Sequence, residues 1–127
     1  MVFLPNLEKA VIPLKNLEDY VLDSNHPRGK HKARIFREFL GIERRHAAVL
    51  AELIRSTLPK APAEQGETDQ YGERWTTYHK IVGLDARSAI VTVAWMFKKN
   101  SEQIPVLISC YIEPKEQEKL RRYFGDE

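Results

Sequence analysis

Apolar residues recur at helical spacing in the first half of the chain. Weak patterns predict one helix from about 13 to 22 and another from about 29 to 40 that ends at Gly41. The strongest pattern lies in "ERRHAAVLAELIRSTL", where one face of a helix would carry Ala47, Leu50, Leu53, Ile54 and Leu58. Three helices are therefore expected before the chain reaches residue 59.

The second half alternates between apolar and polar residues, as strands do. The segments 74–82, 88–97 and 104–113 carry this pattern, and "GLDAR" and "KNSEQ" form the turns between them. Such short connections predict an antiparallel meander. The middle segment is apolar on both faces, which is typical of a central strand, whereas Thr76 and Tyr78 predict a polar, open face on the first segment.

The last predicted strand has two distinct faces. Strict alternation turns Ile108 and Cys110 toward the core, and it places Leu107, Ser109 and Tyr111 on the opposite face.

Two further stretches lack strand-like alternation. The segment 59–73 is rich in proline, glycine and acidic residues and predicts a mobile loop, while the tail predicts a short helix that ends at Gly125. The whole pattern predicts an α+β fold, with two or three N-terminal helices packed on a three- to four-stranded antiparallel sheet. We expect a single domain over residues 1–127.

Composition excludes several classes of protein. Hydrophobic residues make up 43% of the chain and charged residues 30%, and there is no apolar run near the roughly 18 residues of a membrane span. The N-terminus lacks the basic leader of a signal peptide, so we expect a cytoplasmic protein without membrane contact. The single cysteine excludes an internal disulfide. With no HExxH motif or thiol cluster, we expect no metal and no cofactor.

Positive charge is concentrated around the second predicted helix. Between Arg28 and Arg45 there are seven Lys and Arg residues against two Glu, although the net charge of the chain is only +2. This helix begins with "HPRGKHKAR", whereas a helix start normally favours acidic side chains. On a helical wheel the basic stripe contains Lys30, Arg34 and Arg37, while Lys32 falls inside the apolar arc.

Two interpretations of Lys32 remain open at this stage. Its side chain can extend outward along its methylene groups, or it can join the backbone N–H groups of the helix start in binding an anion. His26, just before Pro27, is equally either an ordinary turn residue or a general acid or base.

The chemistry that these residues favour is metal-independent RNA cleavage. The chain has no glycine-rich phosphate loop, nucleophile elbow or kinase signature. Cleaving RNA without a metal needs a base, an acid and cations for the phosphate. The predicted catalytic residues are His26, Lys32, Ser109 and Tyr111. The predicted phosphate-binding residues are Arg28, Lys30, Arg34 and Arg37.

The motif "HPRGKHKARIF" resembles the pattern HPxGxxKAxxF of an uncharacterised prokaryotic domain family. A Tyr-Gly pair at 71–72, Trp95 and the closing "LISCY" also fit, although Ser109 stands where the family pattern has threonine, a change that keeps a hydroxyl. The order of helices and sheet looks like the barnase, EndoU and RelE-like ribonuclease toxin architecture. This resemblance implies a similar fold, and it draws attention to His26 and Lys32.

Two main functional hypotheses follow. The first is a small metal-independent RNA-cleaving enzyme of toxin type. The alternative is a non-catalytic module whose basic helix 30–40 binds nucleic acid or protein, and a purely structural accessory domain is a third. The expected partners are RNA and a small acidic or antitoxin-like protein. The enzyme hypothesis requires His26, Lys32 and Ser109 to meet around an open cleft.

Overall fold

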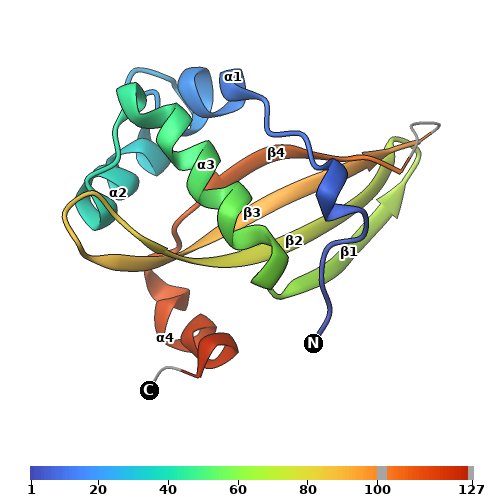
Figure 1. Ribbon diagram of the computed structural model, residues 1–127. Coiled ribbons are helices and arrows are strands. Elements are labelled where there is room, and N and C mark those ends of the chain that lie inside the picture. Colours follow the sequence, from blue (N-terminus) through green and yellow to red (C-terminus); the bar gives the residue numbers. More distant parts are fainter. Residues whose placement is uncertain (100–102, 126–127) are drawn as a thin grey trace.

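The computed structural model describes residues 1–99 and 103–125, and its helices largely precede its sheet (Figure 1). The elements are α1 (Leu14–Asn16), a π-helical turn (Leu17–Val21), α2 (Lys30–Leu40), α3 (Ala47–Thr57), β1 (Ala63–Asp69), β2 (Gly72–Val82), β3 (Ser88–Lys98), β4 (Pro105–Tyr111) and α4 (Gln117–Leu120). The predicted α+β fold is confirmed.

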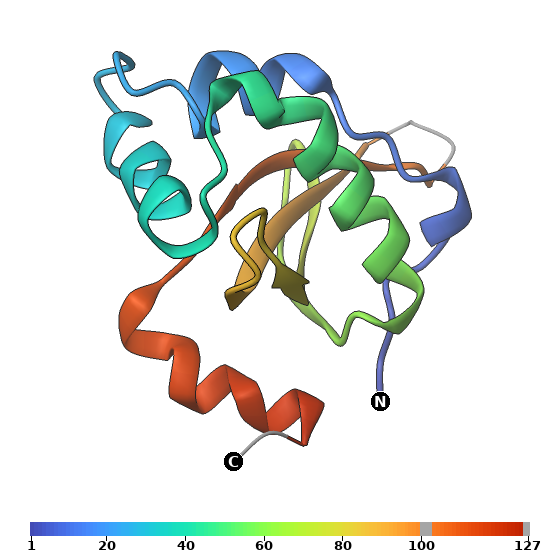
Figure 2. The same cartoon turned by 60° about the vertical axis from the view of Figure 1, so that its left-hand side comes forward.

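The four strands form one antiparallel sheet in the order β1-β2-β3-β4. Helix α3 lies across one face, which we call the covered face, and α1 lies beside α3 and β4 (Figure 1). The C-terminal segment, residues 114–124, crosses the opposite face, which we call the open face (Figure 2). Helix α2 lies beside the sheet at its β4 side, and it also contacts the π-helical turn Leu17–Val21.

The core lies between the covered face and the helices. Residues of β2 alternate as predicted, with Trp75, Thr77, His79 and Ile81 buried in the covered face. The central strand β3 is buried along most of its length, and its Trp95 is fully enclosed, as its apolar pattern predicted. The apolar face of α3 closes this core through Ala47, Leu50 and Ile54, all buried.

Helix α2 ends where the sequence predicted. Gly41 has φ +66°, a left-handed conformation that glycine adopts readily, and its N–H donates to the Arg37 carbonyl at 3.0 Å. Phe36 and Leu40 of this helix are completely buried. The buried side of α2 is therefore the apolar arc predicted from the sequence.

The loop prediction for residues 59–73 was wrong, because residues 63–69 form strand β1. This is an edge strand in which only Ala63 is buried. Its stability comes from backbone hydrogen bonds to β2, and it carries no apolar alternation that a sequence pattern could detect.

A β-bulge reverses the predicted faces in the first half of β4. Ala94 pairs with Ser109 but the next residue, Trp95, pairs with Leu107, so Ile108 is an additional residue in the strand. Leu107 is consequently fully buried, and Ile108 is 40% exposed, which is the opposite of strict alternation. Beyond the bulge, Tyr111 lies beside Thr92 on the open face, as predicted.

Cys110 lies in the core with no disulfide partner. Burial raises the pKa of its thiol to about 12, and the nearby Lys32 charge acts in the opposite direction. The thiol is therefore protonated at neutral pH and behaves as a small apolar residue. Within the described ranges, none of the helices has the length and apolar composition needed to cross a membrane.

Candidate functional site

The His26 ring stabilises the turn just before helix α2. Its Nδ1 accepts hydrogen bonds from the backbone N–H groups of Arg28 and Gly29, both at 3.0 Å. Both donors belong to the turn that leads into α2, and the His26 ring accepts them there. Because Nδ1 is an acceptor, the neutral ring carries its proton on Nε2.

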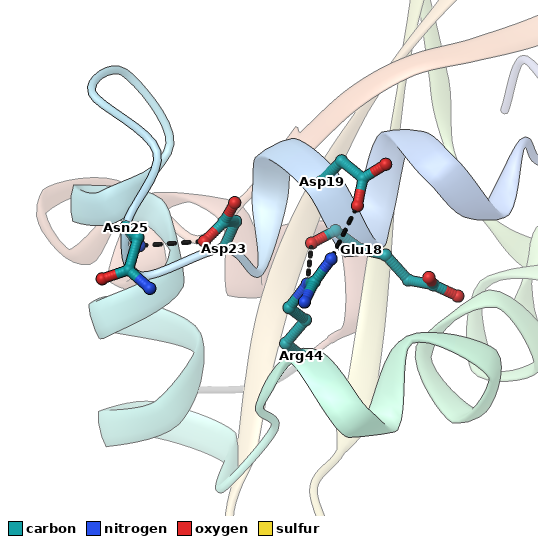
Figure 3. Close-up of polar contacts among 5 residues, drawn as sticks. All are labelled: Glu18, Asp19, Asp23, Asn25 and Arg44. Carbon is teal, nitrogen blue, oxygen red and sulfur yellow. Dashed lines mark hydrogen bonds and ion pairs between the residues drawn. The ribbon is translucent and has the colours of Figure 1, made fainter.

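The turn that holds His26 has its own hydrogen bonds. The Asn25 N–H donates to the Asp23 carboxylate at 2.9 Å (Figure 3). The His26 ring meets the Tyr20 ring edge-on, with centroids 4.9 Å apart. His26 is thus half-buried against the preceding helical segment, rather than pointing freely into solvent.

Gly29 is required by a close approach of two backbones. A Cβ atom at this position would lie 1.9 Å from the Tyr20 carbonyl oxygen. No side chain fits there unless the backbone moves. The glycine of the HPxG motif therefore allows the turn to pack directly against the π-helical segment Leu17–Val21. This contact explains the motif: the turn and Tyr20 pack as one unit.

Lys32 lies between two tyrosine rings. Its Nζ donates to the Tyr20 hydroxyl at 2.9 Å and lies 4.8 Å from the centroid of that ring and 5.9 Å from the centroid of Tyr111. Among the residues that the structure describes, no carboxylate lies within 4.0 Å of this ammonium group. Lys32 is therefore a half-buried cation whose charge no carboxylate of the described residues neutralises.

The residues Tyr20, His26, Lys32 and Tyr111 form a contiguous group that we call the Lys32 cluster. Tyr20 links its members, because its ring contacts His26 and its hydroxyl binds Lys32. Tyr20 was not among the predicted site residues. Its place in the site depends on contacts with residues six and twelve positions later, across a turn.

The open face of the sheet carries a second group of polar residues. Strand pairing places these residues in two neighbouring rows that run across the sheet. The first row is Tyr111, Thr92 and Tyr78. The second row is Ser109, Ala94, Thr76 and Glu64. Between these rows and the C-terminal segment lies a hollow of about 390 Å³, which we call the sheet hollow. Tyr111 lines the sheet hollow and also belongs to the Lys32 cluster.

Ser109 is close in sequence to Tyr111 but differs in environment. Its Oγ is inaccessible to solvent, and in the described part of the chain no group hydrogen-bonds to it. It lies on the open face, opposite Ala94. Its predicted role in positioning a substrate stays a prediction.

The structure separates the basic stripe from the Lys32 cluster. At 100° per residue, Lys30, Arg34 and Arg37 lie roughly 140–160° around helix α2 from Lys32. All three are exposed and line a shallow hollow of about 300 Å³ on the far side of the helix. Arg28 is exposed in the turn. The structure therefore does not bring the eight predicted site residues together, and Lys32 lies on a different side of α2 from the stripe.

Arg44 was not predicted and holds the Tyr20 segment in place (Figure 3). Its Nε donates to the Glu18 carbonyl and its Nη2 to the Asp19 carboxylate, both at 2.8 Å. The hydrogen bond to Asp19 raises the pKa of the Arg44 guanidinium. These partners are 25 and 26 residues away, so no local sequence signal identifies them.

The described residues offer no metal site. In ranges 1–99 and 103–125, no three His, Cys, Asp or Glu side chains gather in a way that could hold a metal ion. The chemistry available at the Lys32 cluster is that of an ammonium group, an imidazole and two phenols.

Comparison with known families identifies the family of this chain. The model of the family described as "Domain of unknown function (DUF6883)" matches residues 3–114. The chain belongs to this family. The matched range contains the whole Lys32 cluster and all four strands, whereas α4 lies beyond it.

One solved structure shares the fold of this DUF6883 member. It is a chain of the "Contact-dependent growth inhibition toxin - immunity protein complex from Klebsiella pneumoniae 342". The TM-score is 0.61 at 16% sequence identity, with 81% of this chain and 99% of that chain covered. At this identity the similarity shows the fold alone. No curated protein matches the chain in sequence.

Proposed function

We propose that this protein is a metal-independent, RNA-cleaving enzyme of toxin type, with the Lys32 cluster as its active site. The observation that carries the proposal is the Lys32 ammonium, which is half-buried between two tyrosines and has no carboxylate partner among the described residues. A cation kept in such a place costs stability unless an anion neutralises it. A phosphate of RNA at the rim of the sheet hollow is the proposed anion.

Cleavage by a 2′-hydroxyl forms a new P–O bond, breaks the bond to the leaving 5′-oxygen and moves a proton from the 2′-hydroxyl to that oxygen; His26 is the group assigned to this proton transfer. Lys32 would stabilise the negative charge that develops on the phosphate, and the ring of Tyr111 would orient the substrate. The Ser109 Oγ is inaccessible to solvent in this structure, so Ser109 makes no direct substrate contact in the proposal. No cofactor takes part in the proposal.

His26 was assigned from the sequence as general acid or base, and it remains in the proposal. The structure leaves Nε2 as the nitrogen that can meet a substrate, because Nδ1 accepts two backbone hydrogen bonds. In this tautomer Nε2–H donates a hydrogen bond to a phosphate oxygen. Acting as a base at Nε2 requires the other neutral tautomer, and acting as an acid requires the imidazolium. Both forms carry a proton on Nδ1 and break both backbone hydrogen bonds, so a pH–rate profile distinguishes proton transfer from simple hydrogen bonding.

The exposed basic residues would act at a distance from the reacting phosphate. Lys30, Arg34 and Arg37 lie on the far side of α2, and Arg28 lies in the turn. We assign them to the RNA backbone beyond the cleavage point, where cations increase affinity without contacting reacting atoms.

A second candidate function uses the same basic stripe without catalysis. Lys30 and Arg37 are exposed, and neither has an ion-pair partner among the described residues. Such a surface fits an acidic partner protein of antitoxin type, and the structural neighbour comes from a toxin–immunity protein complex. Binding of this kind depends on the stripe and not on Lys32.

The test compares two lysines on opposite sides of one helix. Total RNA is incubated with wild type, Lys32→Ala, His26→Ala and the matched control Lys30→Ala, all in the presence of EDTA. The enzyme hypothesis predicts RNA cleavage by wild type and Lys30→Ala, and a loss of about 100-fold or more in Lys32→Ala and His26→Ala. Salt-sensitive binding without cleavage, weakened by Lys30→Ala alone, would favour the binding module.

A further inference from the structure

The sheet hollow is negatively charged, unlike the Lys32 cluster at its rim. Its lining includes the carboxylates of Glu64, Glu113 and Glu116 and only one lysine, Lys119. Lys119 already faces Glu116 at 3.9 Å. A phosphate is repelled from such a hollow, whereas a neutral group that presents N–H donors is attracted to it. The two parts of the open face therefore suit different parts of one ligand.

Glu64 is the acceptor best placed for such a group. The Tyr123 hydroxyl donates to its carboxylate, and the Tyr78 and Tyr123 rings stack beside it, with centroids 5.2 Å apart and an interplanar angle of 16°. A carboxylate can accept about four hydrogen bonds, so Glu64, which is exposed, keeps acceptor capacity for a ligand. Tyr123 is 38% exposed, which leaves part of the aromatic pair open.

The wall that carries Tyr123 is firmly attached. The buried Gln117 side chain accepts from the Ile90 N–H at 2.8 Å and donates to the Ile90 carbonyl at 3.0 Å. It pairs with β3 in the way a neighbouring strand would, at a point beyond the last β3–β4 pair, Thr92 with Tyr111. Leu120 is buried as well. The sheet hollow is therefore bounded by fixed elements on both sides.

We infer that the sheet hollow is a nucleobase-binding subsite, and that Glu64 selects a guanine through its two neighbouring N–H donors. Guanine presents N1–H and the 2-amino group side by side, which matches the two oxygens of a carboxylate. Adenine and cytosine place an acceptor beside their donor, and uracil has one N–H between two carbonyls. The Thr76 and Thr92 hydroxyls and the aromatic pair would complete the contacts.

The connection to RNA cleavage rests on the proposed function. Strands β4 and β1 are three strand spacings apart, roughly 14 Å, so a phosphate at Lys32 and a base at Glu64 belong to the same or adjacent nucleotides. The selected base would then lie next to the cleaved bond, and the enzyme would cut RNA beside guanine.

The experiment measures binding of GMP and IMP by NMR titration of the ¹⁵N-labelled protein. IMP differs from GMP only by lacking the 2-amino group, and UMP serves as a third ligand. The proteins are wild type, Glu64→Gln, Lys32→Ala and the matched control Glu67→Gln, which changes an exposed glutamate on the same strand outside the sheet hollow. All are first checked for the wild-type thermal midpoint.

We expect wild type and Glu67→Gln to bind GMP about tenfold or more tightly than IMP and UMP. Glu64→Gln places an amide donor against the guanine donors and should abolish this preference. Lys32→Ala should weaken all three nucleotides alike and leave the preference intact. Equal affinities for GMP and IMP in wild type, no detectable binding of GMP, or a preference that survives Glu64→Gln would each overturn the inference.

The failure of one proposal is distinguishable from that of the other. A Glu64-dependent GMP preference in a protein that cleaves no RNA supports the base subsite and contradicts the enzyme. RNA cleavage that requires Lys32 but occurs equally beside all four bases supports the enzyme and contradicts the base subsite.

Discussion

Both faces of the sheet carry polar residues, but these residues differ in how far their hydrogen bonds are satisfied within the protein. On the covered face, His79 is fully buried, with Nδ1 2.7 Å from the Thr57 hydroxyl and Nε2 2.7 Å from the Thr77 hydroxyl. The Trp95 indole N–H in turn donates to Thr77 at 2.8 Å. Every polar group of this network is bonded within the protein, which is the usual condition for burial.

On the open face the polar groups are left with capacity to bind. Lys32, at the edge of this face, has a single hydrogen-bond acceptor among the described residues, the Tyr20 hydroxyl, and Glu64 is exposed. Adjacent residues of one strand thus differ in environment: Thr77 bonds within the core, while Thr76 lines the sheet hollow. Polar groups bonded within the core stabilise the fold, and accessible ones with remaining hydrogen-bonding capacity are candidates for binding a ligand.

The largest expected loss of stability comes from a substitution on the covered face. Trp95→Ala should lower the free energy of unfolding by about 3–5 kcal/mol, because it leaves a cavity and removes the N–H bonded to Thr77. Met96→Ala, next in the strand and half-buried on the open face, should cost only about 1 kcal/mol. Urea unfolding measures both values, and equal losses would contradict the contrast between the faces.

The His79 network should make stability depend on pH. Burial lowers the pKa of His79 to about 3, below its ordinary value of 6.5. Below pH 6.5 the unfolded chain therefore binds a proton that the folded protein does not, and folding stability is lost as the pH falls toward 3. Between pH 7 and pH 5 the expected loss from this group is about 2 kcal/mol.

The comparison with His79→Gln isolates this contribution. The variant should be less stable at pH 7 but should lack the loss of about 2 kcal/mol on going to pH 5. Urea unfolding at the two pH values gives the difference directly. An identical pH dependence in both proteins would show that His79 is not the group responsible.

A smaller effect is expected at the turn beside the open face. Gly29→Ala should cost about 1–2 kcal/mol, because its Cβ would collide with the Tyr20 carbonyl and force the two segments apart. Ser24→Ala, exposed in the same turn region, should change stability by less than about 0.5 kcal/mol. Displacement of Tyr20 should also appear as shifted NMR signals of His26, which Ser24→Ala leaves in place.

The smallest effect on stability is expected at Lys32, where the proposed function predicts a large loss of activity. Lys32→Met keeps the apolar stem and removes a charge that no carboxylate among the described residues neutralises, so the free energy of unfolding should stay within about 0.5 kcal/mol or rise. Lys30→Met provides the exposed comparison. A loss above about 2 kcal/mol for Lys32→Met alone would make Lys32 a structural residue.

The elements with strong periodicity could be predicted from the sequence. Helix α3, the alternation of β2 and the buried central strand follow from apolar spacing, which records burial residue by residue, and the end of α2 follows from Gly41. Strand β1 could not be predicted in this way, because an exposed edge strand depends on backbone bonds to its neighbour. The bulge at Ile108 was hidden for a similar reason, since it arises from pairing between two strands.

For the candidate site, the sequence identified unusual residues but not their neighbours. His26 and Lys32 stood out through the motif and the helical wheel. Their joint contact with Tyr20, and the contact of Lys32 with Tyr111 from the far end of the chain, come from packing. Glu64 and Tyr123 gave no signal, because 59 residues separate them and only folding brings them together.

The sequence by itself determined which faces are apolar, where the helices end and which cations lie against the expected pattern, because these properties depend on neighbours within one turn or one strand. The tertiary structure alone decided that Lys32 points toward two tyrosines and away from Lys30, that the His26 ring packs against Tyr20, and that a C-terminal segment closes a hollow over the open face. Those outcomes depend on contacts between distant segments, which local patterns do not record.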